Sequence, residues 1–190
     1  NMKIVFATNN YNKIKEVQNA LPNVELVSLK SIGCIEDLAE DQKTLEGNAQ
    51  QKAEYVFNKY KLPCFADDTG LIIDSLDGAP GVYSARYAGD DCNAEKNMDL
   101  VLDSLEDKEN RVARFKTVIC LFTEAGPKFF DGIAEGEILL KRTGKDGFGY
   151  DPIFRPEGFD KSFAEMSIAQ KNEISHRGIA VRKLIKELEK

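Results

Sequence analysis

Hydrophobic and polar positions repeat with two different periods in the first half of this chain, which predicts an alternation of strands and helices. Short runs rich in β-branched and aromatic side chains predict strands over 3–8 and 24–29. Apolar residues at helical spacing predict helices over 12–21 and 44–60. The longer helix is the clearer of the two, because its apolar positions recur over four turns.

The second half of the chain has longer strand patterns. Residues 93–105 predict one more helix, while the β-branched stretch 111–123 predicts a central strand, with one or two partner strands over 128–140. A glycine-rich and aromatic loop follows over 142–159, and Ser175 is expected to cap a final helix. The pattern is typical of an α/β domain with a mixed central β-sheet flanked by helices and a strand-rich second lobe.

Two adjacent carboxylates, Asp67 and Asp68, follow the apolar run 62–66 and precede Thr69 and Gly70. We predict a buried strand that ends at the acidic pair and is followed by a glycine turn. Because side chains alternate across a strand, the two carboxylates should point in different directions. Neighbouring carboxylates with no adjacent cation repel and are costly to bury, so a divalent ion or a shared proton is expected there. The alternative is a solvated acidic turn.

The composition bounds the possible functions. The 190 residues are 42% hydrophobic and 31% charged, which is typical of one soluble globular domain, and no apolar run approaches the ~20 residues of a membrane span. A formal charge of −6 argues against a nucleic-acid binder. The cysteines form no C-x-x-C pair and indicate reduced residues of a cytoplasmic protein: Cys34, Cys64, Cys92 and Cys120.

Three further features are candidates for binding an anion or a metal ion. The turn between the first strand and the first helix could bind phosphate through backbone N–H groups and Lys13, although it lacks the G-x-x-x-x-G-K pattern. Lys52 borders the apolar face of the 44–60 helix, and Glu40 lies in an acidic stretch before it. The alternatives are a surface turn, a lysine with a packed stem, and a solvated acidic segment.

Two segments near the C-terminal end could recognise a planar ring. Glycines in the segment 144–152 allow close approach of the backbone, and Phe148 and Tyr150 offer faces that stack on a base. A hairpin with packed aromatic residues is the alternative. The only histidine, His176, lies beside Arg177 at a predicted helix N-terminus, where a cation is unfavourable unless an anion or a ring carbonyl binds there.

Seven segments in order along the chain resemble the inosine triphosphate pyrophosphatase family, whose members hydrolyse non-standard purine nucleoside triphosphates. They are T-N-N-Y-N-K-x-x-E, E-G-N-A-Q-Q-K-A, F-A-D-D-T-G-L, G-A-P-G-V-Y-S-A-R-Y-A-G, F-G-Y-D-P-I-F, A-E-M and K-N-E-I-S-H-R. The resemblance implies one two-lobed domain over residues 2–190, with a nucleotide cleft between the lobes. It also implies a homodimer, dependence on Mg²⁺, and a nucleoside monophosphate and pyrophosphate as products.

The resemblance also implies roles for individual residues. Glu40 and Asp68 are expected to bind Mg²⁺, with Asp41 as the alternative to Glu40, and Asp68 is expected to accept the proton of the attacking water. Thr69 is expected to contact the substrate. The triphosphate is assigned to Thr8, Asn9, Asn10, Tyr11, Asn12, Lys13 and Lys52. The nucleobase is assigned to Phe148, Gly149, Tyr150, Asp151, Lys171, His176 and Arg177.

The chain departs from the family pattern at two places. The usual T-G-N is Thr8-Asn9-Asn10 here, and we expect asparagine to replace glycine at a positive φ angle. The usual D-D-S-G is D-D-T-G, which keeps the hydroxyl group. Neither change removes a group that the chemistry needs.

The chemistry expected from the residues agrees with the resemblance. Cleavage of an α–β phosphoanhydride needs an aimed water, a hard cation and lysines that neutralise the triphosphate. A pocket of hydrogen-bond donors would favour a 6-oxo purine over adenine, since adenine presents an amino donor there. The rival hypotheses are a Maf-like pyrimidine triphosphate pyrophosphatase, a haloacid-dehalogenase-type phosphatase, whose D-x-D-x-T pattern is absent, and a non-catalytic nucleotide sensor.

Overall fold

A mixed β-sheet is the framework of the structure, a computed structural model that describes residues 2–190. Within that range the seven strands are arranged in the order β2-β1-β3-β5-β6-β7, with β4 paired to β3. The strands are β1 (Met2–Phe6), β2 (Val24–Val27), β3 (Cys64–Ile73), β4 (Pro80–Gly81), β5 (Val112–Thr123), β6 (Gly126–Ile138) and β7 (Phe154–Pro156). Strand β1 is parallel to β2 and β3, whereas β4 and β7 pair antiparallel, so the predicted mixed α/β fold is confirmed.

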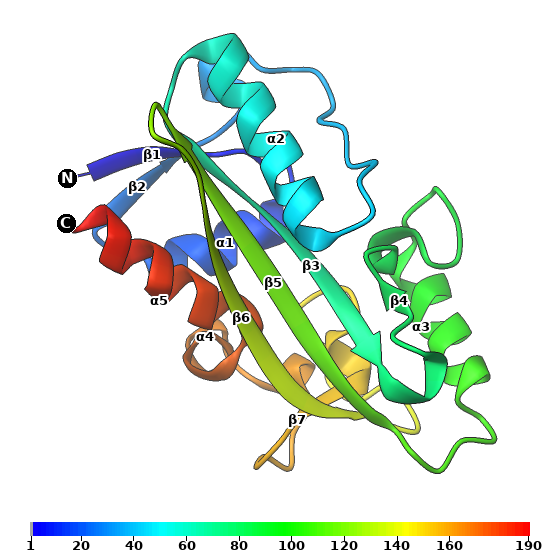
Figure 1. Ribbon diagram of the computed structural model, residues 1–190. Helices are drawn as coiled ribbons and strands as arrows, with labels where there is room; N and C mark the ends of the chain where they lie inside the picture. The colour runs from blue at the N-terminus through cyan, green and yellow to red at the C-terminus, as the bar shows by residue number, and fades with distance from the viewer. Residues whose placement is uncertain (1) are drawn as a thin grey trace. The chain divides into compact units, whose positions relative to one another are not determined.

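Five α-helices lie within the described residues (Figure 1). They are α1 (Tyr11–Ala20), α2 (Leu45–Tyr60), α3 (Ala94–Ser104), α4 (Ile168–Ile174) and α5 (His176–Leu188). None of them is long and apolar enough to cross a membrane. The chain divides into two compact units, the first made of residues up to 68 together with 117–132 and 177–190, the second of 69–116 and 133–176. The cleft expected from the resemblance stays a prediction.

Polar side chains at the helix starts explain why three of the four predicted helices begin where they do. The Asn10 side chain accepts a hydrogen bond from the Lys13 backbone N–H, and Thr44 and Asn93 cap α2 and α3 in the same way. Each cap satisfies a backbone donor that has no partner inside the helix. The sequence prediction of these helices is therefore confirmed to within about a turn at either end.

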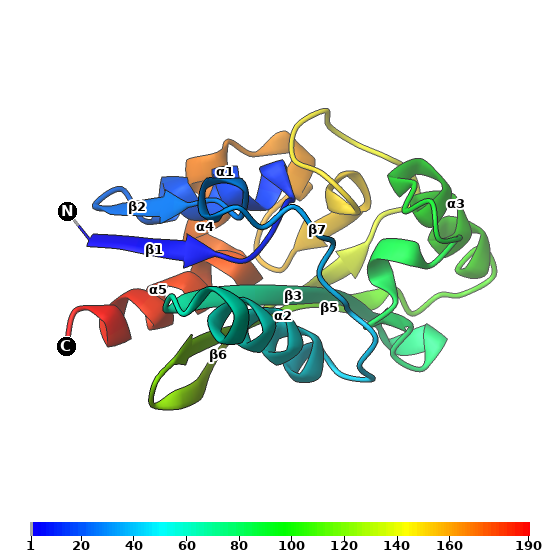
Figure 2. The ribbon, with the colours of Figure 1, turned by 90° about the horizontal axis from the view of Figure 1, so that it is seen from above.

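The core of the first unit lies on both faces of its strands. Phe6 of β1 and Phe65 of β3 stack with ring centroids 4.4 Å apart, within a cluster that also contains side chains of α1 and α5. On β5, Ile119 belongs to this cluster, whereas Phe122 contacts Phe57 of α2 at 5.3 Å. Because side chains alternate along a strand, α1 and α2 cover opposite faces, as Figure 2 shows.

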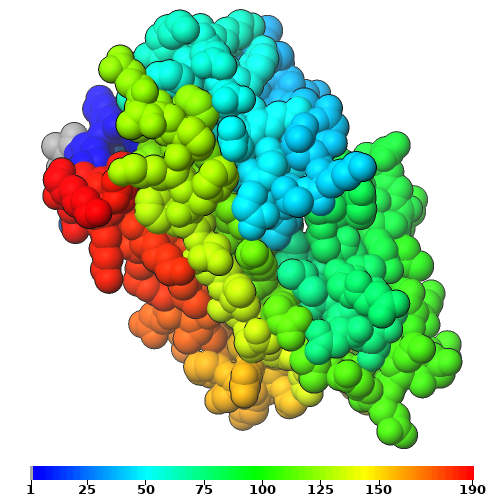
Figure 3. Space-filling model, viewed as in Figure 1, coloured from blue at the N-terminus to red at the C-terminus, as the bar shows by residue number. Residues whose placement is uncertain are grey.

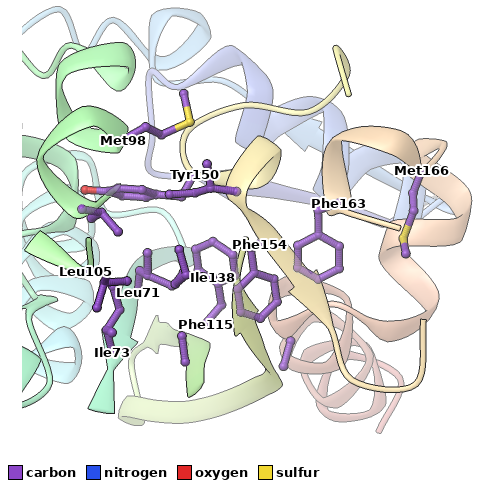
Figure 4. Packing of buried hydrophobic residues seen from close by; sticks show 14 residues of the cluster. Leu71, Ile73, Met98, Leu105, Phe115, Ile138, Tyr150, Phe154, Phe163 and Met166 are labelled. Atoms are coloured by element: carbon purple, nitrogen blue, oxygen red, sulfur yellow. The ribbon is translucent and has the colours of Figure 1, made fainter. Parts of the chain in front are cut away.

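The second unit has its own core, rich in aromatic residues. Figure 4 shows the rings of Phe154 and Phe163 side by side, with centroids 5.2 Å apart. Phe115 of β5 packs against both rings, at 4.6 and 6.0 Å. Tyr150 belongs to the same buried cluster, so a residue of the predicted loop over 142–159 is part of the core.

Two predictions about the elements are wrong, and one helix was not predicted. Strand β3 does not end at the acidic pair but continues through Asp67, Asp68 and Gly70 to Ile73, because these residues are buried in the sheet and Gly70 keeps strand geometry. The predicted loop contains the short strand β7, paired with β6. Helix α4 was not predicted, since seven residues are too few for a clear period, and Ser175 lies between it and α5.

Gly136 of β6 gives a testable prediction for the β6–β7 pairing. A Cβ atom at this position would lie 2.3 Å from the Arg155 carbonyl oxygen and 2.6 Å from the Phe154 ring, so Gly136→Ala should force β7 away. We expect it to lower the free energy of unfolding by about 3 kcal/mol, measured by urea denaturation.

Gly158 is the matched control, because a Cβ atom there meets nothing within 4 Å and only its positive φ of 85° is unfavourable. Gly158→Ala should cost about 1 kcal/mol. Equal losses in the two variants would contradict the proposed backbone clash.

Candidate active site

Asp67 is held by two cations in the first unit. Its Oδ1 atom accepts a hydrogen bond from Lys13 Nζ at 3.0 Å, and its Oδ2 atom accepts one from Arg177 Nε at 3.0 Å. Arg177 also donates to Glu16 Oε1 at 2.8 Å. Burial alone would raise the pKa of Asp67, but the charges of Lys13, Arg177 and Lys52 outweigh it and hold the pKa well below its usual range. The predicted alternative of a solvated turn is therefore wrong.

Asp68 has a different environment, as expected from strand alternation. Its Oδ2 atom accepts a hydrogen bond from Asn48 Nδ2 at 3.0 Å, and the side chain is buried. Burial raises the pKa of Asp68, although Lys52 and Lys13 act in the opposite direction. Two adjacent carboxylates thus have pKa shifts of opposite sign, which is typical of acid–base pairs with different roles.

Lys52 of α2 is buried with its ammonium group inside the site. Its Nζ atom lies 2.5 Å from Glu40 Oε1 and 2.6 Å from the carbonyl oxygen of Asp67. Burial alone would lower the pKa of Lys52, but the charges of Glu40, Asp67 and Asp68 raise it. The alternative of a packed stem with an exposed ammonium group is wrong.

Glu40 and Asp41 differ in their contacts. Asp41 Oδ1 accepts hydrogen bonds from Gln51 Nε2 of α2 at 2.8 Å and from Gln42 Nε2 at 2.9 Å. Glu40 instead pairs with Lys52, and its charge acts on Asp68. These contacts favour Glu40 over Asp41, and the assignment of the metal ligand stays a prediction.

The turn between β1 and α1 presents polar groups at a helix N-terminus. Thr8 Oγ1 accepts a hydrogen bond from the Asn10 N–H at 3.1 Å, while Asn9, Tyr11 and Asn12 are exposed. Asn9 does not have a positive φ angle, so the expected replacement of glycine at such an angle is wrong and the turn needs no left-handed residue. A helix N-terminus with exposed N–H groups suits an anion.

A second group of predicted site residues lies in the other unit. Asp151 Oδ2 accepts hydrogen bonds from Lys171 Nζ at 2.7 Å and from the Phe148 N–H at 3.0 Å. The Lys171 ammonium group lies 4.9 Å from the centre of the Phe148 ring. A Cβ atom at Gly147 would lie 2.2 Å from Asp151 Oδ2, so the loop closes tightly around this carboxylate.

Other predicted residues of the second unit have structural contacts. Tyr150 is buried and donates a hydrogen bond from its hydroxyl group to the Ser84 carbonyl oxygen at 2.6 Å. Its ring is thus part of the core, and of the two predicted stacking faces only Phe148 stays a candidate.

His176 is buried and stacks on Phe115 with centroids 4.5 Å apart. Thr69 follows Asp68 in β3 and is partly exposed. Gly149 has open space beside it, because a Cβ atom there would meet nothing within 4 Å.

The carboxylates limit how a metal ion could bind. No group of three or more histidine, cysteine, aspartate or glutamate side chains that could hold a metal is found in residues 2–190. Glu40, paired with Lys52, and Asp68, on which the charges of Lys52 and Glu40 act, are the two carboxylates predicted as ligands. Such a pair fits Mg²⁺, which is usually bound through one or two carboxylates together with substrate phosphates and water.

Some site residues were not predicted from the sequence. Glu16 stands in the ninth position of T-N-N-Y-N-K-x-x-E, and Asn48 stands one turn before Lys52 in E-G-N-A-Q-Q-K-A. A polar residue one turn away from a functional lysine on the same helix face is the signal that could have pointed to Asn48. Glu16 is 161 residues from its partner Arg177 along the chain, so no local pattern reveals their contact.

Comparison with known proteins gives consistent matches over nearly the whole chain. Residues 4–187 match the Ham1 family. The dITP/XTP pyrophosphatase of Flavobacterium johnsoniae is 56% identical over 185 residues, covering 97% of this chain and 96% of the relative. That of Christiangramia forsetii is 55% identical over 190 residues, with both chains covered completely. The solved structure of a HAM1 protein from Coxiella burnetii has a TM-score of 0.90 at 37% identity, and covers 100% of this chain and 99% of that one. The predicted family resemblance is confirmed.

The Asp67 ion pairs predict a pH-dependent contribution to stability. Asp67→Asn removes the carboxylate paired with the buried Lys13 and leaves Arg177 paired with Glu16 only, so we expect the free energy of unfolding at pH 7 to fall by about 3–5 kcal/mol. Because the folded pKa lies below the unfolded value of about 3.9, this stabilisation is complete above pH 5 and is lost as the pH falls toward the folded pKa.

Urea denaturation of the native protein and of Asp67→Asn at pH 7, 5 and 3.5 measures the difference in their free energies of unfolding. Asp74→Asn is the control, since its ion pair with Arg114 is half exposed and should contribute less than about 1 kcal/mol. If the loss of unfolding free energy in Asp67→Asn grew as the pH falls, the lowered pKa assigned to Asp67 would be wrong.

Proposed function

This chain belongs to the Ham1 family, and we propose that it hydrolyses non-standard purine nucleoside triphosphates (ITP, dITP and XTP) to the monophosphate and pyrophosphate. The relatives from Flavobacterium johnsoniae and Christiangramia forsetii, both named dITP/XTP pyrophosphatase, support it at 56% and 55% identity. The observation that carries the proposal is the buried cluster in which Lys13 and Lys52 surround the adjacent carboxylates Asp67 and Asp68.

Asp68 is the proposed proton acceptor. Burial raises the pKa of its carboxylate, which makes it a stronger base toward water than an exposed aspartate. Hydrolysis forms a bond between the water oxygen and the α-phosphorus and breaks the bond between that phosphorus and the bridging oxygen, so pyrophosphate leaves. Asp67 cannot take this role, since its two cations keep it ionised and fixed in place.

The triphosphate is proposed to bind at the N-terminus of α1 and beside the two lysines. Asn9, Asn10, Tyr11 and Asn12 surround the exposed first turn of α1, whose backbone N–H groups and positive dipole end favour an anion. The ammonium groups of Lys13 and Lys52 are proposed to supply positive charge beside this turn.

Mg²⁺ is the proposed cofactor, with Glu40 and Asp68 as its protein ligands. When bound, the ion neutralises charge on the phosphate oxygens and polarises the bond that breaks. The pair of carboxylates fits a hard cation, because Glu40 is paired with Lys52 and the charges of both residues act on Asp68.

Recognition of the base is proposed to involve the second unit. Phe148 offers a ring for stacking. The Asp151 carboxylate accepts a hydrogen bond from the Phe148 backbone N–H and forms an ion pair with Lys171. His176 is fixed by its stack on Phe115. Arg177 stays a predicted donor to the 6-oxo group, with its guanidinium oriented by Asp67 and Glu16.

We also propose that residues 2–190 act as one two-lobed domain in a cytoplasmic homodimer. The four cysteines are free thiols, which fits a reducing compartment. Large apolar side chains on the surface, among them Ile35 and Leu140, are available for an interface between subunits.

Product analysis tests the reaction and the base preference together. With Mg²⁺ present, we expect pyrophosphate from ITP and little product from ATP or dTTP, with no orthophosphate from any of them. Pyrophosphate from dTTP would favour a Maf-like enzyme, orthophosphate a phosphatase, and tight ITP binding without product a nucleotide sensor.

Asp68→Asn tests the proposed base. The amide keeps the shape of the side chain but cannot accept the proton, so kcat for ITP should fall at least about 10³-fold while the Kd for ITP changes little. Asp103→Asn, at an exposed carboxylate of α3, is the control and should behave as the native protein does. Near-native kcat in Asp68→Asn would remove Asp68 from the mechanism.

A further inference from the structure

Asn48 joins two parts of the first unit through a single side chain. Its Nδ2 atom donates to Asp68 Oδ2 at 3.0 Å, and its Oδ1 atom accepts from the Gln42 backbone N–H at 2.9 Å. The side chain is 2% exposed, so both hydrogen bonds are shielded from water. Asn48 therefore links the carboxylate of Asp68 to the segment that carries Glu40.

The start of α2 is shaped to bring this segment close. A Cβ atom at Gly47 would lie 2.8 Å from Gln42 Cβ and 3.0 Å from Thr44 Oγ1, so only glycine lets the chain fold back so tightly. Figure 3 shows the residues before α2 packed against the helix on one face of the molecule. Lys52, one turn after Asn48, contacts Glu40 from the same face of the helix.

The chemistry of the amide explains why asparagine stands at this position. An asparagine side chain offers a donor and an acceptor on two atoms of one short group, whereas aspartate offers acceptors only and leucine offers neither. A hydrogen bond to one carboxylate oxygen restricts rotation of the whole group. In a buried site such a bond is strong enough to set the orientation of Asp68.

We propose that Asn48 is a positioning residue that orients the Asp68 carboxylate for catalysis and holds the Glu40 segment in register with it. The proposal rests on the function proposed above, in which Asp68 accepts a proton. Asn48 acts through the Asp68 carboxylate to which it donates, so its effect is expected in the rate of the chemical step and not in the affinity for substrate.

Gln51 provides a matched control on the same helix. Its Oε1 atom accepts from the Asp41 N–H at 3.2 Å and its Nε2 atom donates to Asp41 Oδ1 at 2.8 Å, so it anchors the same segment three residues along α2. Within the part of the chain that the structure describes, Gln51 makes no hydrogen bond to Asp68. A Gln51 variant therefore disturbs the segment that carries Glu40 and Asp41 without removing the hydrogen bond that orients the Asp68 carboxylate.

The test compares Asn48→Leu, Asn48→Asp and Gln51→Leu with the native protein. Pyrophosphate release from ITP is measured at saturating Mg²⁺, and kcat and KM are determined separately. We expect both Asn48 variants to lower kcat about 100-fold with KM changed less than about threefold, because a misplaced catalytic group costs rate and not ground-state binding. Gln51→Leu should keep kcat within about threefold of the native value.

Asn48→Asp keeps the proposal testable if Asn48→Leu does not fold, because aspartate has the same shape and retains the acceptor for the Gln42 N–H. Thermal unfolding of each variant, measured in the assay buffer, shows which ones are folded. Near-native kcat in folded Asn48→Asp would overturn the proposal, as would an equal loss of kcat in Asn48→Asp and Gln51→Leu. A native protein that releases no pyrophosphate would instead overturn the proposed function, and this inference with it.

Discussion

The ion pairs that Asp67 makes with Lys13 and Arg177 are the constraint on which the rest of the first unit depends. They join β3 to α1 and α5 at a position where all three side chains are largely buried. A buried carboxylate without such partners would be costly, and removing either partner would leave an uncompensated charge. The three elements must therefore keep one arrangement, and that arrangement places the first turn of α1 and the start of α2 beside the same strand.

The fixed position of Asp67 determines what its neighbour can do. Because β3 continues through both residues, the Asp68 side chain points away from the cations that hold Asp67 and toward Asn48 of α2. At Asp67 the nearby cations outweigh the effect of burial and lower the pKa, whereas at Asp68 burial outweighs the cations and raises it. One strand thus supplies a permanent anion that organises the unit and a less strongly neutralised carboxylate that suits proton transfer.

The sequence predicted the parts of the fold that depend on local chemistry. The helices could be predicted because Asn10, Thr44 and Asn93 cap them and apolar residues recur along them. The course of β3 through Asp67 could not, since it depends on Arg177, a partner 110 residues away. The resemblance of the motifs predicted most residues of the candidate site. The hydrogen bonds of Asn48 and the packing of Tyr150 in the core could be found only from the three-dimensional structure.

The balance of charge in the first unit is consistent with the proposed role of a metal ion. Lys13, Lys52 and Arg177 are already paired with Asp67, Glu40 and Glu16, and Asp68 adds a further carboxylate. These side chains together carry no net positive charge, so contacts of Lys13 and Lys52 with phosphate oxygens would not neutralise a whole triphosphate. A divalent ion held by Glu40 and Asp68 would supply further positive charge and would reduce the repulsion between these two carboxylates. Metal and substrate are then expected to bind together, because each makes the other's site favourable.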